Sequence, residues 1–194
     1  GSANIYLKNN ANEKAIGLLE RLVHVEGKDP DAHADLGAAY AASGDRPRAQ
    51  QEFEAALRLE PKHASALVGL GNLKLKNGEE ERAIELLRAA GEAAPRAFEP
   101  RFLLGSAYNR LGRFADALTE LEAAVRLGAN ESEVYYHLAR AYGGLGRTED
   151  RARALARFAE LTRKQKEDTE AQRRAMRLLE QAKTLVAAGD LQTA

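Results

Sequence analysis

The sequence of 194 residues predicts an all-α solenoid built from antiparallel helix pairs. The first observation is a period of 34 residues, at which a leucine recurs together with a small residue directly after it. These recurring positions are Leu36, Leu70, Leu104 and Leu138, followed by Gly37, Gly71, Gly105 and Ala139. The second observation is that apolar residues recur at helical spacing within each block, whereas no segment alternates with a period of two. A repeat of this length indicates stacked units that bury their apolar faces against their neighbours.

Each block divides into two helices at a glycine, which is suited to ending a helix and turning the chain. The turn glycines of the four blocks are Gly44, Gly78, Gly112 and Gly146. Pro47 follows a predicted N-cap at Asp45, and Pro100 falls in the first turn of its helix, where a missing N–H is tolerated. We therefore expect each block to form a helix, a short turn and an antiparallel helix.

Small residues on both helices of a pair predict that the two axes approach closely. The first helices carry the glycines of the leucine–glycine pairs, and the second helices carry Ala49, Ala83 and Ala117. Large apolar residues at the flanking positions would fill the space above and below this contact. Arg151 stands at the alanine position of the fourth block, which puts the packing of that pair in question.

The recurring residues resemble the signature of the tetratricopeptide repeat family. The resemblance covers residues 30–161 as four repeats, at 30–63, 64–97, 98–131 and 132–161. A partial N-terminal repeat at 1–29 precedes them, and a charged helical extension at 162–194 runs into a partial C-terminal repeat. The resemblance implies a right-handed superhelix whose first helices line a concave groove for a peptide or a partner's helix.

The same resemblance implies which residues face this groove. The predicted peptide-binding residues are Val68, Asn72, Leu75, Phe102, Ser106, Asn109, Tyr136 and Arg140. The rings of Phe102 and Tyr136 are suited to burying apolar side chains of a peptide, and an asparagine amide can both donate to and accept from its backbone. The alternative is that these rings pack against adjacent helices and that the asparagines are solvated.

The C-terminal segment predicts a second function. Residues 148–188 contain neither proline nor glycine, and opposite charges four residues apart support a solvated helix. We expect one continuous helix, the alternative being a break near Glu167 that lets the last helix fold back as a fifth repeat. A continuous helix would leave an apolar stripe in need of a partner, and this predicted oligomer interface is Met176, Leu179, Ala182, Leu185 and Val186.

Composition argues against several other classes of function. Lys plus Arg and Asp plus Glu both number 29, so the chain has no general attraction to nucleic acid or to an anionic membrane. There is no cysteine, the four histidines lack metal-ligand spacing, and no apolar run could cross a bilayer. No nucleophile has a recognisable base nearby in sequence.

The sequence thus predicts a protein-interaction scaffold with a protein or peptide partner, and neither an enzyme nor a binder of a cofactor or metal. The alternatives are a self-associating structural module and a regulatory arm of a larger protein. The compartment is not indicated: the general composition resembles that of bacterial repeat proteins, which would place a soluble chain in the cytoplasm or periplasm. Gly1 and Ser2 look like a cleavage scar, so the natural N-terminus is expected to differ.

Overall fold

The computed structural model describes the backbone of residues 2–25 and 27–190 and the side chains of residues 13–25 and 27–184. All regular secondary structure in these residues is helical, as predicted. The helices are α1 (Ser2–Val25), α2 (Pro30–Ser43), α3 (Arg46–Leu59), α4 (Ala64–Asn77), α5 (Glu80–Ala93), α6 (Glu99–Arg110), α7 (Phe114–Arg126), α8 (Ser132–Gly144) and α9 (Thr148–Asp190).

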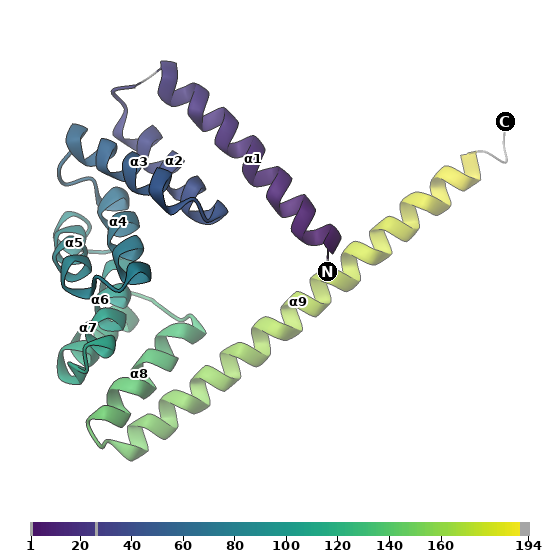
Figure 1. Cartoon of the computed structure of the whole chain (residues 1–194). Helices are drawn as coiled ribbons and strands as arrows, with labels where there is room; N and C mark the ends of the chain where they lie inside the picture. The colour runs from purple at the N-terminus through teal and green to yellow at the C-terminus, as the bar shows by residue number, and fades with distance from the viewer. Residues whose placement is uncertain (1, 26, 191–194) are drawn as a thin grey trace.

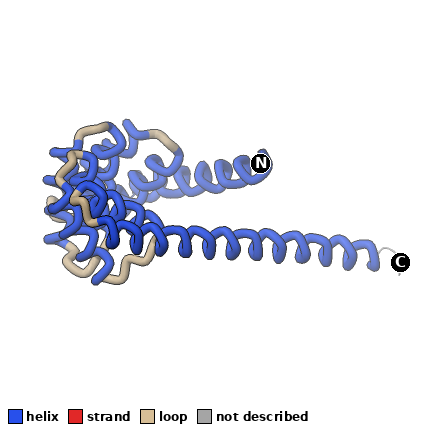
Figure 2. The backbone as a smooth tube through the Cα atoms, turned by 90° about the horizontal axis from the view of Figure 1, so that it is seen from below, coloured by secondary structure: helices blue, strands red, loops and turns tan. Residues whose placement is uncertain are grey.

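The helices form a curved stack of antiparallel pairs, which confirms the predicted solenoid (Figure 1). The pairs are α2 with α3, α4 with α5, α6 with α7, and α8 with α9. The first helices α2, α4, α6 and α8 also contact one another in succession, and they lie on the inner side of the curve. Helix α1 packs on α2, and α1 and α9 both project from the same side of the stack (Figure 2).

The predicted turns are confirmed by the backbone. Gly44, Gly78, Gly112 and Gly146 all have positive φ angles, between 71° and 90°, a conformation that glycine adopts without steric cost. Asp45 caps α3 by accepting a hydrogen bond from the backbone N–H of Arg48. The chain therefore reverses direction at the same point of every pair.

Within each of the first three pairs, a large apolar side chain lies directly against a glycine. Ala49, Ala83 and Ala117 are completely buried beside these contacts. A Cβ atom added to Gly71 would lie 2.8 Å from Cγ of Leu87, and one added to Gly105 would lie 2.4 Å from Cγ of Leu121. No side chain fits at these positions without displacing its neighbour, so the glycines set the distance between the two helices.

The fourth pair packs despite Arg151, because a glycine stands opposite the arginine. A Cβ atom added to Gly143 would lie 3.3 Å from Cδ of Arg151, so the arginine side chain extends across the surface of α8. Arg151 is exposed, in contrast to the buried alanines of the other pairs. The substitution thus changes the surface of the pair rather than its interior.

Helix α9 is a single helix of 43 residues, with no interruption near Glu167. Its first part pairs with α8, and the remainder extends beyond the stack (Figures 1 and 2). The alternative of a last helix folding back as a fifth repeat is therefore wrong for the residues described, since the backbone stays helical as far as Asp190.

Gly105→Ala should lower the free energy of unfolding by about 1–3 kcal/mol, because the new methyl group would overlap the Leu121 side chain. Urea unfolding followed by circular dichroism would measure the change. Gly91→Ala is the matched control, since its Cβ would meet its nearest neighbour, Arg101, at 3.8 Å. That variant should be neutral or more stable by up to about 1 kcal/mol through helix propensity. Equal losses in both variants would contradict the steric account.

Candidate functional site

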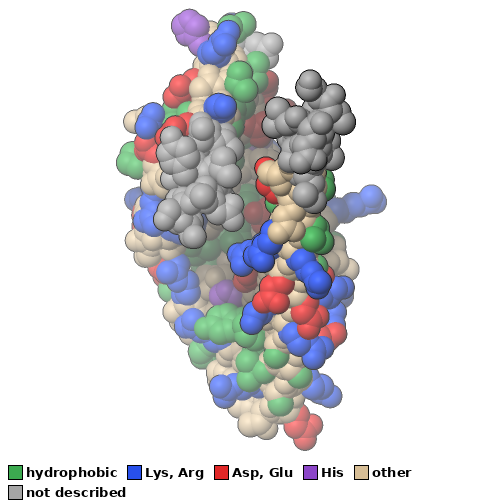
Figure 3. Space-filling model, turned by 90° about the vertical axis from the view of Figure 1, so that its right-hand side faces the viewer, with side chains coloured by type: hydrophobic (Ala, Val, Ile, Leu, Met, Phe, Trp, Pro, Cys, Tyr) green, Lys and Arg blue, Asp and Glu red, His purple; other side chains and the backbone are tan. Residues whose placement is uncertain are grey.

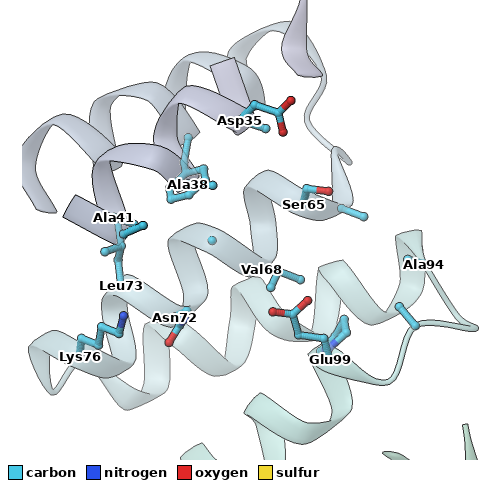
Figure 4. Close-up of a pocket in the computed structure, with 17 residues that line it drawn as sticks. Asp35, Ala38, Ala41, Ser65, Val68, Asn72, Leu73, Lys76, Ala94 and Glu99 are labelled. Atoms are coloured by element: carbon cyan, nitrogen blue, oxygen red, sulfur yellow. The ribbon is translucent and has the colours of Figure 1, made fainter. Parts of the chain in front are cut away.

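A hollow of about 460 Å³ lies on the inner side of the stack, between the first two helix pairs and the start of the third. Figure 4 shows it as a recess between α2, α4 and the α5–α6 connection. The lining residues are Ala34, Asp35, Ala38, Ala41, Ala42, Phe53, Ala64, Ser65, Val68, Gly69, Asn72, Leu73, Lys76, Ala94, Ala97, Glu99 and Pro100. Most of them are alanine or another apolar residue, so the wall is predominantly apolar.

The ring of Phe53 reaches in from α3 and is part of the lining of the hollow. The ring lies between two glycines: an added Cβ would come within 2.8 Å of it at Gly37 and within 2.3 Å at Gly69. These glycines belong to neighbouring first helices, α2 and α4. The buried ring therefore joins the core of the first pair to the wall of the hollow.

Charged side chains lie at opposite ends of the hollow (Figure 4). Asp35 on α2 lies at the end near Ser65, Glu99 on α6 lies across the recess beside Val68, and Lys76 stands at the other end beyond Asn72. All three charged side chains are exposed, and none forms an ion pair with another residue in the described part of the chain. The hollow thus has an acidic end at Asp35, with Glu99 towards its middle, and a basic end at Lys76.

Of the eight residues predicted to bind a peptide, two line this hollow. Val68 lies at its centre and Asn72 near its basic end (Figure 4). Tyr136 and Arg140 line a second hollow, of about 310 Å³, between α8 and α9, together with Arg151 and Leu155. Phe102 and Ser106 are half-buried on α6 and line neither hollow.

The other two predicted residues are inside the protein, which corrects their placement in an open groove. Leu75 belongs to the hydrophobic core, and Asn109 has 0% of its surface exposed. The amide Nδ2 of Asn109 donates a hydrogen bond of 2.8 Å to the backbone carbonyl of His137. The physical reason is that consecutive first helices contact one another, and this contact covers positions near their C-terminal ends.

Sequence reasoning missed Asp35 and Lys76. Lys76 directly follows the predicted Leu75, and a step of one residue turns a helix by about 100°. The observed hollow is lined by more than one residue per turn of α4, including Ser65, Val68 and Gly69. The sequence did contain a signal, since these two charges flank an alanine-rich surface and mark its edges. From sequence alone they could not be distinguished from ordinary solvated charges.

The aromatic residues of the third and fourth pairs form a connected group around His137. The ring of His137 makes edge contacts with Phe102, at 5.5 Å between centroids, and with Tyr136, at 5.4 Å. Tyr136 in turn contacts Phe158 of α9 and keeps 49% of its surface exposed. Phe102 therefore packs against the adjacent helix, as the alternative interpretation expected, whereas Tyr136 packs and also faces solvent.

The surroundings of His137 favour its neutral form. Burial lowers the pKa of His137, and the nearby positive charge of Arg140 lowers it further. Its buried Nδ1 atom has no hydrogen-bond partner among the residues described. An imidazole without a partner for an added proton is poorly suited to carrying a charge.

Two further findings concern metal binding and membrane spans in the described residues. They contain no group of three or more His, Cys, Asp or Glu residues placed to hold a metal ion. None of the helices described is long and apolar enough to cross a membrane.

A curved stack of 34-residue helix pairs with a hollow on its first helices defines a tetratricopeptide-type scaffold for protein interactions. The chain belongs to this repeat family: residues 8–187 match the family described as the Cilia and flagella-associated protein 70 middle TPR-like domain.

Solved structures of MamA are similar in fold and, more distantly, in sequence. A MamA RS-1 double mutant has a TM-score of 0.69 and 28% identity, with 82% of this chain and 89% of that chain covered. MamA of AMB-1 has a TM-score of 0.63 and 30% identity, covering 80% and 85%. MamA from Desulfovibrio magneticus RS-1 has a TM-score of 0.64 and 27% identity, covering 83% and 89%. No curated protein matches the chain.

His137→Leu should remove part of the pH dependence of stability. Because the pKa of His137 is lowered in the folded chain, the unfolded chain binds a proton more readily. Stability is therefore complete above the ordinary value of 6.5 and falls as the pH drops through 6.5 towards the folded pKa. Urea unfolding at pH 7.5 and at about pH 5.5 would measure this. A stability difference between variant and wild type that is the same at both pH values would contradict the assignment.

Proposed function

We propose that the chain binds a segment of a partner protein on the inner side of its helix stack, with the 460 Å³ hollow as the main contact. The observation that carries this proposal is the hollow itself, which runs across the first helices of three consecutive pairs and is lined mainly by apolar atoms. Binding is favourable at such a surface, because the partner's apolar side chains displace water from the apolar lining. Of the residues predicted from the sequence to bind a peptide, Val68 and Asn72 would contact the partner in this hollow.

The second hollow extends this proposed surface towards the C-terminal end of the stack. Tyr136 offers a partly exposed ring there, beside the guanidinium groups of Arg140 and Arg151. Figure 3 looks onto this side of the molecule, where hydrophobic side chains lie in the recess and charged side chains of both signs cover α9. Aromatic and arginine side chains are the residues that most often contribute strongly to protein interfaces.

Ala38→Arg should abolish partner binding without disturbing the fold. Ala38 is exposed and lines the hollow, so a long charged side chain there would occupy the space that a partner needs. Affinity capture from the native cell followed by mass spectrometry would compare the variant with the wild type. Ala115→Arg is the control, because Ala115 is also exposed but lies on α7 and does not line the hollow. Proteins captured by the wild type and by both variants alike would contradict the proposal.

Self-association through α9 is a second candidate function, because its far part carries apolar side chains with nothing packed on them among the described residues. Met176 is 68% exposed and Leu179 is 53% exposed, and Leu178 lies beside them. Ala182 is exposed on the same helix, whereas the side chains of Leu185 and Val186 lie outside the described residues. Exposed apolar stripes on a helix favour pairing with another helix.

Leu179→Glu should abolish self-association if α9 forms the interface, since a buried carboxylate would oppose helix pairing. Sedimentation velocity at tens of micromolar would compare the variant with the wild type. Gln181→Glu makes the same change in charge two residues further on, on the opposite side of the helix, and should leave assembly intact. A monomeric wild-type chain at these concentrations would eliminate this function while leaving groove binding unaffected.

A further inference from the structure

We propose that the 460 Å³ hollow accepts an amphipathic α-helix of the partner, about three turns long, with its N-terminal end at Asp35 and its C-terminal end at Lys76. This inference rests on the proposed function and specifies the kind of partner segment. The length follows from α4, along which the hollow runs from Ser65 to Lys76, a rise of roughly 16 Å.

The wall of the hollow is better suited to a helix than to an extended peptide. An extended chain exposes an N–H and a C=O at every residue, and each needs a hydrogen-bond partner once water is removed. Between its charged ends, the lining offers only the Ser65 hydroxyl and the Asn72 amide as side-chain partners. The second amide that could have held an extended backbone, Asn109, is buried and already bonded to the carbonyl of His137. A helix satisfies its own backbone groups and needs no such partners.

The short side chains of the wall allow a helix to approach closely. Ala38 and Ala41 on α2 face Val68 and Asn72 on α4 across the recess (Figure 4). Helices pack at interaxial distances of about 8–10 Å, with the larger side chains of one helix filling the spaces of the other. Here the wall supplies the space, so the partner must supply the large apolar side chains along one face of its helix.

The charges at the two ends set the direction of the bound helix. Asp35 and Glu99 would face basic side chains, and Lys76 would face an acidic one. None of the three charged groups has an ion-pair partner within the described residues, so each is available to a ligand. Complementary charges of this kind favour one orientation more than they raise affinity.

Two synthetic helical peptides of about 11 residues test this inference, a length set by the rise per residue. Both carry the same leucine face and the same composition, but one has lysines in its first turn and glutamates in its last, whereas the other intersperses them. Fluorescence anisotropy should show that the chain binds the first peptide on the order of tenfold more tightly, the sum of two or three exposed ion pairs. Equal affinities, or no binding of either peptide, would overturn the inference.

A variant of the protein without the three charges of the hollow complements the peptide comparison. The triple change Asp35→Asn, Glu99→Gln and Lys76→Met should reduce the affinity for the first peptide to that for the second. The control triple change Glu81→Gln, Glu92→Gln and Lys62→Met alters exposed residues outside the hollow and should preserve the preference. If both peptides bind equally and Ala38→Arg abolishes both, the groove binds helices without charge selection, so the inference fails and the proposed function stands.

The direction of the bound helix can be tested by disulfide capture, because the chain contains no cysteine of its own. A peptide with an N-terminal cysteine should be captured by Ser65→Cys, at the acidic end, and not by Asn77→Cys, beside Lys76. Preferential capture by Asn77→Cys would overturn the proposed direction. Circular dichroism of each variant would verify that the helix content is unchanged.

Discussion

The whole stack depends on how closely the first helix of each pair approaches the second. At Gly37, Gly71 and Gly105 the missing side chain lets Phe53, Leu87 and Leu121 lie directly against a neighbouring backbone. Because the first three pairs repeat this contact, they form similar units, and similar units stack with a regular curvature. The inner side of the curve, and therefore the hollow on it, is a consequence of the packing within each pair.

Phe53 shows how this packing extends into the candidate site. Its ring is larger than the leucines at the equivalent positions, and Gly69 on the next first helix makes the additional room. One side chain thus packs against both α2 and α4 and also lines the hollow between them. Changes in the core of the first pair would therefore alter the shape of the binding surface, even though the core residue itself is buried.

The fold could be predicted from the sequence because its signals repeat. The leucine–glycine pairs, the alanines of the second helices and the turn glycines each occur several times at fixed spacing, so an error at one position does not change the result. The site was less predictable because it depends on contacts between units. Asn109 is buried where it bonds to His137 of the next first helix, and Leu75 is buried in the hydrophobic core, which neither residue's position on its own helix reveals. Asp35 and Lys76 became recognisable only when three helices brought them to opposite ends of one recess.

The unbroken course of α9 has a mechanical consequence. A helix of 43 residues spans roughly 65 Å, and its first turns are fixed by packing against α8. A molecule bound near its far end is therefore held at a fixed distance and orientation relative to the groove, which a flexible linker would not provide. If one molecule bound in the groove and another at the far end of α9, the chain would keep them apart and would fix their relative orientation without direct contact between them.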